Sequence, residues 1–147
     1  MDIKIKKLSP HDSNEFISLI QLFEQVFEMK DLRIPDEKYL QQLLEKDDFF
    51  VFVALHQDEV VGGLTSYIMH QYYSTRPLVY IYDLAVKNEL QRQGIGKRLI
   101  ACNNNYCKDM NVEVVMVQAD EVDDYAIDFY RTTGATGEKV VHFDYQL

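Results

Sequence analysis

The chain is poor in the residues that mark secreted, metal-binding and nucleic-acid-binding proteins. Of its 147 residues only two are cysteine and four are histidine, and neither Cys102 and Cys107 nor the histidines have the spacing of a metal site. We therefore expect reduced thiols, a cytoplasmic protein and no metal. The 15 lysines and arginines face 24 acidic residues, a formal net charge of −9. Such a charge repels nucleic-acid phosphates, so nucleic acid is an unexpected partner.

Long hydrophobic runs are also absent. No segment approaches the length of a membrane span, and the alternating apolar and charged residues at the start do not resemble a signal peptide. The 47% of hydrophobic residues still predicts a folded chain, and the length predicts one domain, residues 1–147. The surplus carboxylates allow two interpretations. They keep a cytosolic protein in solution, or they attract a cationic substrate.

Hydrophobic periodicity predicts alternating strands and helices. We expect strands over residues 2–7, 49–56, 60–69, 79–86, 112–119 and 139–145. We expect helices to start at Ser9-Pro10 and at Pro35-Asp36, to run from Gly94 to about Asp109, and to run from Ala126 to a glycine cap at Gly134. Within the third strand, Gly62-Gly63 predicts a bulge or a close backbone approach. This order predicts an α/β layered sandwich with a mixed sheet.

Residues 79–100 form the most informative segment: a strand, a short turn and the start of a helix. The strand is apolar at most positions, which predicts burial on both faces. Glycines follow at positions 94 and 96, beside the cationic Arg92, Lys97 and Arg98. Free N–H groups and the positive end of the helix dipole favour an anion at such a turn. The segment therefore predicts a diphosphate site.

Spacing decides which diphosphate motif the turn resembles. A P-loop would have glycine where Gln91 stands, and a dinucleotide fingerprint would have glycine where Leu99 stands, so neither fits. Gln91-Arg92-Gln93-Gly94-Ile95-Gly96 instead resembles the Q/R-x-x-G-x-G/A acetyl-coenzyme A signature of the GNAT superfamily of N-acetyltransferases. The alternative is a strand–turn–helix corner that happens to contain two glycines.

The GNAT resemblance extends over nearly the whole chain. It implies a GNAT-like layered α/β sandwich, with a mixed central sheet of about six to seven strands and helices on both faces. It also implies acetyl-coenzyme A as the acetyl donor and coenzyme A as a product. The donor would be held mostly by main-chain groups of Leu84, Ala85, Val86, Gln91, Arg92, Gln93, Gly94, Ile95, Gly96 and Lys97. Ala126-x-x-x-Tyr130-x-x-x-Gly134 is similar to the second motif of the superfamily, which often has Asn where this chain has Asp123.

Three further stretches resemble one group within the superfamily. They are Tyr80-Ile81-Tyr82-Asp83-Leu84-Ala85-Val86, Val117-Gln118-Ala119-Asp120 and His142-Phe143-Asp144. Together they resemble the aminoglycoside 3-N-acetyltransferases of the GNAT type. The resemblance implies direct attack of the 3-amino group of an aminoglycoside in a ternary complex, and a homodimer is common in the superfamily.

The chemistry of acetyl transfer assigns expected roles to two residues. A carboxylate inside an apolar strand is costly unless it is paired or used, so Asp83 is the expected group that binds the ammonium and takes its proton. A structural aspartate is the alternative. The resemblance implies Tyr130 as the acid that protonates the leaving thiolate, and a buried aromatic is the alternative there. Substrate contacts are expected from Tyr82, Asp83, Asp120 and Asp144, whereas Glu121, Asp123 and Asp124 fit an acidic wall and a solvated turn equally well.

Two other functions stay open at this level. A GNAT enzyme with these features could acetylate a polyamine, a peptide N-terminus or a lysine. A protein of a different class, a non-catalytic sensor module, would bind acetyl-coenzyme A without turnover. The expected partner in every case is a small molecule or an amine substrate, with no membrane involved.

Overall fold

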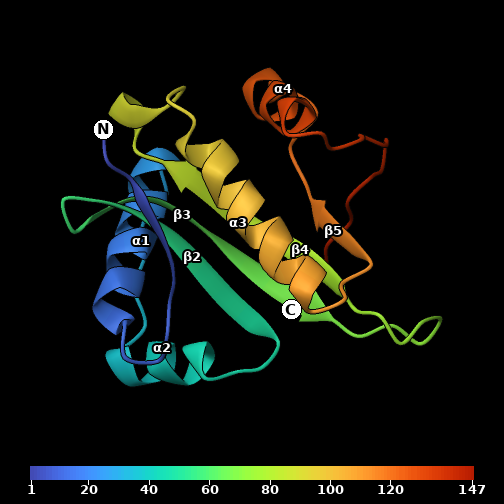
Figure 1. Cartoon of the computed structure of the whole chain (residues 1–147), viewed down its shortest axis with the longest axis horizontal. Coiled ribbons are helices and arrows are strands. Elements are labelled where there is room, and N and C mark those ends of the chain that lie inside the picture. Colours follow the sequence, from blue (N-terminus) through green and yellow to red (C-terminus); the bar gives the residue numbers. More distant parts are fainter.

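A five-stranded sheet with helices on both faces organises the chain, as the computed structural model of residues 1–147 shows (Figure 1). The strands are β1 (Lys4–Lys7), β2 (Phe49–His56), β3 (Glu59–Met69), β4 (Leu78–Val86) and β5 (Val114–Val117). The helices are α1 (Ser13–Val26), α2 (Glu37–Leu44), α3 (Ile95–Asp109) and α4 (Asp124–Thr132), with a 3-10 turn, η1, at Asn88–Leu90. None of the helices is long and apolar enough to cross a membrane.

The strands lie in the order of the sequence, antiparallel from β1 to β4 and parallel between β4 and β5. The parallel pairing is short, because β5 pairs only with Leu78–Ile81. Beyond Ile81 the two strands part, and residues 82–86 of β4 have no strand on that edge. The opposite edge of β4 carries a bulge: Thr65 pairs with Asp83 and Ser66 with Ile81, so Tyr82 is an extra residue. Such bulges re-aim the neighbouring side chains.

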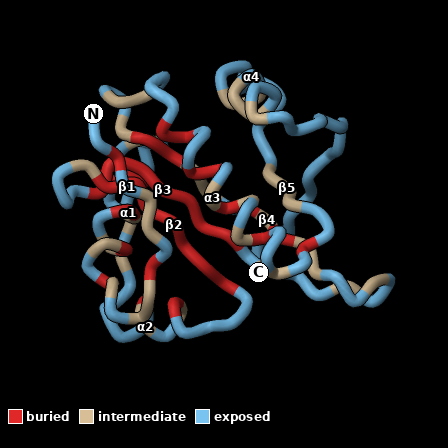
Figure 2. Tube along the Cα trace, in the orientation of Figure 1, coloured by how far each residue is buried: buried red, intermediate tan, exposed pale blue.

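Two hydrophobic cores lie on opposite faces of the sheet. One packs α1 and α2 on β2, with Leu19 and Leu40 almost fully buried. The other packs α3 on β2, β3 and β4, with Leu99 at its centre. Burial is concentrated in these strands and fades toward α4, where no residue is fully buried (Figure 2). The expected close backbone approach is confirmed at Gly63, because a Cβ there would lie 2.8 Å from the main-chain oxygen of Phe52.

Three expectations from the sequence are wrong in detail. The sheet has five strands, not six to seven, because residues 139–145 form no strand; an extended segment becomes a strand only where a neighbour pairs with its main chain. The first helix starts at Ser13 and not at Ser9-Pro10, because the Asp12 carboxylate accepts hydrogen bonds from the N–H and hydroxyl of Ser9 and forms a local turn. Strand β4 is buried on the α3 face, but Tyr82 on the other face is 64% exposed.

Candidate active site

The turn between β4 and α3 has the backbone geometry of an anion site. Arg92 and Gly94 both adopt left-handed conformations, with φ of 62° and 85°. Left-handed residues in a turn direct neighbouring N–H groups into one concavity. Gly94 caps α3 without a side-chain hydrogen bond, so the first N–H groups of the helix have no side-chain partner and can bind an anion.

The polar side chains of this turn divide into structural and free groups. The Gln91 amide donates to the carbonyl of Val86 and to the side chain of Asn88, both at 3.1 Å, and ties the turn to the end of β4. Arg98 donates to the carbonyl of Ile3 at 2.6 Å and joins α3 to the N-terminal segment. Lys97 is exposed and makes no ion pair, so it remains available to a ligand.

The two glycines of the signature have different structural roles. Gly94 needs its freedom for the left-handed backbone, and a Cβ there would meet nothing within 4 Å. Gly96 has ordinary helical geometry, but a Cβ there would lie 2.9 Å from the ring of Phe129. The second glycine thus lets α4 pack closely on the start of α3. Arg92 adds a second link, with its guanidinium 5.3 Å from the centre of the Tyr125 ring of α4.

Asp83 lies next to the point where β4 and β5 part. It is half-buried, and burial raises the pKa of its carboxyl above the ordinary value. Its N–H donates to the hydroxyl of Thr65 at 3.3 Å, but no side chain donates to its carboxylate and no cation pairs with it. A partly desolvated carboxylate without a partner is costly, and such a group is typical of functional sites. No neighbour pairs with the carboxylate, but Asp83 directly follows the bulge at Tyr82, so a structural aspartate at a bulge stays the alternative to the catalytic role.

Tyr130 extends from α4 toward the same region. Burial, with smaller effects from the nearby Asp83, Asp123 and Tyr80, raises the pKa of its hydroxyl to about 12. The hydroxyl makes no hydrogen bond within the chain, although the ring packs on Phe129 with centroids 5.1 Å apart. Tyr130 is thus both a packed aromatic and a free, protonated donor near Asp83.

A row of aromatic rings leads across the sheet to Asp83, on the face that carries α1 and α2. Ser66 donates to Asn103 of α3, so its neighbour Tyr67 faces the opposite side of the sheet. Ring centroids are 5.0 Å apart for Phe49–Tyr67, 5.9 Å for Tyr67–Tyr82 and 6.0 Å for Tyr82–Tyr80. We call Phe49, Tyr67, Tyr82 and Tyr80 the aromatic row.

The aromatic row has polar neighbours at both ends. Burial raises the pKa of Tyr67, and the nearby Tyr82, Tyr39, Asp83 and Asp48 add to the shift. At the other end, the Tyr80 hydroxyl donates to Gln118, just beyond β5, at 3.1 Å. Tyr67, Tyr39 and Asp48 were not predicted from the sequence as neighbours of the site. Tyr80 and Tyr82 alternate on β4, and the expected pairing of that strand with residues 60–69 was the signal that could have revealed Tyr67.

The other predicted substrate residues lie at the margin of the site or outside it. Asp120 is exposed in the turn after β5, and its carbonyl accepts the N–H of Asp123. The Asp123 carboxylate accepts the N–H of Ala126 and caps α4, which explains an aspartate at this position. Asp144 lies in the exposed C-terminal segment, where its carboxylate accepts only from Gln146. No hydrogen bond or ion pair joins Asp144 to any residue around Asp83.

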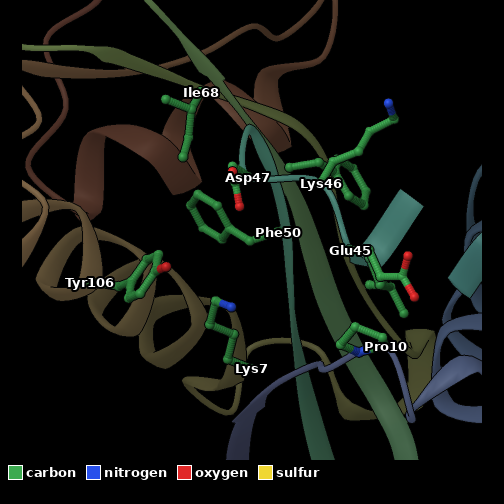
Figure 3. A pocket seen from close by; sticks show the side chains of 10 residues that line it. Lys7, Pro10, Glu45, Lys46, Asp47, Phe50, Ile68 and Tyr106 are labelled. Atoms are coloured by element: carbon green, nitrogen blue, oxygen red, sulfur yellow. The ribbon is translucent and has the colours of Figure 1, made fainter. Parts of the chain in front are cut away.

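A separate hollow of about 340 Å³ lies near β1 and the end of α2. Lys7, Phe50 and Tyr106 line one part of it (Figure 3), and the Lys7 ammonium lies 5.3 Å from the centre of the Tyr106 ring. The remaining lining includes acidic and basic side chains and Phe49 of the aromatic row, but none of the site residues predicted from the sequence. We assign this hollow no role in the chemistry.

Comparisons with known proteins agree with this geometry. The Acetyltransferase (GNAT) family matches residues 16–135. The aminoglycoside acetyltransferase meta-AAC0020, from an uncultured soil metagenomic sample, is 56% identical with a TM-score of 0.97, over 99% of this chain and 96% of that chain. It was solved in complex with trehalose and, in a second structure at 55% identity, with sisomicin. The aminoglycoside acetyltransferase HMB0005, also from an uncultured soil metagenomic sample, is 32% identical with a TM-score of 0.94 over 100% and 99% of the two chains. The comparison with curated proteins gave no match.

Fold, turn and free carboxylate together define an acyltransferase with a nucleotide-linked donor. The chain belongs to the GNAT family of acetyltransferases, whose acetyl donor is acetyl-coenzyme A. The residues present fit this donor. The left-handed turn and the uncapped start of α3 can hold its diphosphate, and the unpaired edge of β4 can hydrogen-bond its amide-containing arm.

Proposed function

We propose that this protein acetylates the 3-amino group of an aminoglycoside, with direct transfer in a ternary complex. The observation that carries the proposal is the unpaired, partly desolvated carboxylate of Asp83 beside the aromatic row. An ammonium group is the natural partner of a carboxylate that has none within the chain. Aromatic faces attract cationic groups as well, so a polycationic amino sugar matches both parts of the site.

The relatives support the same acceptor class. Two soil-derived acetyltransferases that align over nearly the whole chain are described as aminoglycoside acetyltransferases, and one of them was solved with sisomicin. The net charge of −9 adds a field that draws polycations toward the protein. A lysine side chain or a peptide N-terminus brings one ammonium group and would use less of this surface.

Each chemical task falls to a group already in place. Asp83 binds the acceptor ammonium and takes its proton, directly or through water, so that a neutral amine can attack. The donor supplies an acetyl thioester. Main-chain N–H groups at residues 84–86 on the open edge of β4 can stabilise the oxygen as it gains charge. As the N–C bond forms and the C–S bond breaks, Tyr130, still protonated with a pKa of about 12, gives its proton to the departing sulfur. The second proton that the nitrogen loses as the amide forms restores the Tyr130 hydroxyl, directly or through water.

An acetyl-transfer assay tests the proposal with a panel of amines. The panel contains gentamicin, sisomicin, spermidine and a lysine peptide, each incubated with acetyl-coenzyme A, and coenzyme A release is measured. We expect turnover of the aminoglycosides, and NMR of the product should place the acetyl group on the 3-amino nitrogen. Folded protein that acetylates only spermidine or the peptide contradicts the acceptor; folded protein that binds the donor without turnover identifies a sensor.

Tyr67→Leu probes the aromatic row with the fold retained, because leucine keeps the apolar contact with Phe49. We expect KM for the aminoglycoside to rise about tenfold, equivalent to the loss of roughly 1.4 kcal/mol of binding. KM for acetyl-coenzyme A should stay constant. Asp83→Asn is the variant for comparison, because it should act on the chemical step. We expect it to lower kcat about 10²-fold. If Tyr67→Leu leaves KM for the aminoglycoside unchanged, the aromatic row does not bind the acceptor.

A further inference from the structure

The bulge at Tyr82 decides on which face of the sheet Asp83 lies. Tyr80 pairs with Tyr67 before the bulge, and Asp83 pairs with Thr65 after it. Directly paired residues point to the same face, and Tyr67 and Thr65, two positions apart on β3, share the face that carries α1 and α2. Without the extra residue, Asp83 would alternate with Tyr82 and point toward α3.

The residues after the bulge agree with this placement. Leu84 packs against the core on the α3 side, whereas Ala85 is buried in the core on the α1 side. Asp83 precedes Leu84 and therefore lies on the α1 side, like Ala85. A bulge one residue further along β4 would reverse the placement and bury the carboxylate beneath α3. The position of the proposed proton acceptor thus depends on where the bulge lies.

Two consecutive residues of β3, Thr65 and Ser66, flank the bulge. They stand opposite Asp83 and Ile81, on either side of the extra residue. The Thr65 hydroxyl accepts the main-chain N–H of Asp83 at 3.3 Å. The Ser66 hydroxyl, on the other face, donates to the side-chain oxygen of Asn103 in α3 at 2.8 Å. Because hydrogen bonds are directional, the two hydroxyls distinguish this register from one displaced by a residue.

Ser66 and Asn103 are fully buried polar residues against an apolar core. The Asn103 amide nitrogen donates to the side chain of Asn104 at 3.2 Å and lies 3.8 Å from the sulfur of Cys107. Alanine and leucine could fill these positions without needing partners, so packing alone does not explain the pair. A buried and satisfied polar pair specifies one arrangement of the elements that it joins.

The pair also relates the bulge to the donor turn. Asn103 follows the first residue of α3, Ile95, by eight positions, which is about 12 Å along the helix axis. Helix α3 lies along the sheet (Figure 1), mostly on apolar residues, and apolar contact is non-directional. A hydrogen bond from α3 to Ser66 therefore fixes the distance between the anion-binding start of the helix and Asp83.

We propose that Asn103, Ser66 and Thr65 are positioning residues for acetyl transfer. The Asn103–Ser66 bond holds the bulge from the α3 face, and Thr65 holds the main chain of Asp83 from the other. Together they direct the Asp83 carboxylate to the acceptor side and set its distance from the donor. None of the three takes part in the chemistry itself. Their effect on turnover rests on the proposed function, whereas their hold on the bulge does not.

A double variant separates positioning from ordinary packing. Asn103→Leu alone leaves the Ser66 hydroxyl buried without a partner and should lower the melting temperature. Ser66→Ala/Asn103→Leu removes both polar groups, which is close to neutral for stability, so the melting temperature should recover. We expect kcat for the aminoglycoside to stay about tenfold below wild type, with KM for acetyl-coenzyme A unchanged. Recovery of kcat together with stability overturns the positioning role.

Thr65 allows a test with less risk to the fold. Thr65→Val keeps the branched shape and removes the hydroxyl, and should lower kcat about tenfold. Thr65→Ser keeps the hydroxyl and should retain most of the wild-type kcat. Equal values in the two variants would mean that the hydrogen bond to Asp83 has no part in turnover, which overturns the role of Thr65.

Amide hydrogen exchange, measured by NMR, reports on the bulge without any substrate. The N–H of Asp83 should exchange about tenfold faster in Thr65→Val and in Ser66→Ala/Asn103→Leu than in wild type. The N–H of Val53, in the middle of β2, should not change. Wild-type exchange at Asp83 in both variants overturns the hold on the bulge. Faster exchange with wild-type kcat overturns the positioning role.

Ile100→Val is the matched control, because it removes one buried methylene from the α3 core without changing a polar group. It should lower the melting temperature by about 2–4 °C and leave kcat unchanged. A loss of kcat as large as in the double variant would mean that any loosening of α3 slows the reaction, against a specific role of Asn103. Inactivity of wild type with every aminoglycoside rejects the proposed function instead, while amide exchange still decides what holds the bulge.

Discussion

The carboxylate of Asp83 lowers the stability of the folded protein when it is ionised, and it is also the proposed proton acceptor. Its carboxyl has a pKa raised by burial, so the folded state holds the proton more tightly than the unfolded state. The contribution of this group to stability is therefore fully present below the ordinary aspartate pKa and declines as pH rises through the raised value. Above the raised pKa the ionised carboxylate destabilises the empty site, and a bound ammonium would relieve that cost.

Asp83→Asn should accordingly raise the melting temperature at pH 7–8 while it lowers turnover. The gain should shrink as the pH falls through the raised pKa of Asp83, because wild-type Asp83 then takes up a proton in the folded state. Thermal denaturation of both proteins across this pH range measures the difference. An Asp83→Asn protein that is less stable than wild type at pH 7 would show that the carboxylate has a stabilising partner.

Tyr130 should act on the chemical step alone. Tyr130→Phe keeps the packing on Phe129 and removes only the hydroxyl, so kcat should fall about 10²-fold with donor binding unchanged by calorimetry. Because the pKa of Tyr130 is about 12, its ionisation should leave no inflection in the pH–rate profile below pH 10. A wild-type rate in Tyr130→Phe would show that Tyr130 serves only in packing.

At the scale of elements, the start of α3 joins donor binding to the placement of α4. Gly94 provides the left-handed turn, and Gly96 provides the space for Phe129. Since Tyr130 follows Phe129, a shift of that ring also moves the expected acid. The two glycines therefore support the same reaction through different physical effects.

Alanine at each glycine should separate these effects. Gly94→Ala should cost about 1–2 kcal/mol of stability through left-handed strain and raise KM for acetyl-coenzyme A. Gly96→Ala should lower kcat more than it changes that KM, because the new Cβ displaces Phe129 and with it Tyr130. Steady-state kinetics of both variants, with melting curves, make the comparison. Identical kinetic profiles would contradict separate roles.

At the scale of the whole molecule, charge should act with opposite sign on the two substrates. The net charge of −9 attracts a polycationic aminoglycoside and repels the anionic donor, and added salt screens both effects. From about 0.05 M to 0.5 M salt, KM for the aminoglycoside should rise several-fold. KM for acetyl-coenzyme A should fall or stay constant. A parallel rise in both values would indicate a general salt effect on the enzyme.

Local patterns were sufficient to predict most elements and part of the site. Alternation and helical periodicity identified the β2–β3 hairpin, β4 and α3 because these segments bury regular apolar faces. The glycine-bearing turn after an apolar strand predicted the diphosphate site, since its backbone geometry depends on neighbouring residues. Asp83 stood out because its charge interrupts that strand.

Contacts between distant segments decided the rest. The aromatic row exists because pairing of β3 with β4 and the bulge at Tyr82 bring four rings together, and no local pattern encodes that register. The space at Gly96 depends on Phe129, more than thirty residues away. Residues 139–145 have the composition of a strand in the sequence but form none in the single chain, because a strand requires a partner. By itself the sequence determined which segments can be helix, strand or turn. Tertiary structure decided which of them meet, since pairing and packing depend on the whole chain.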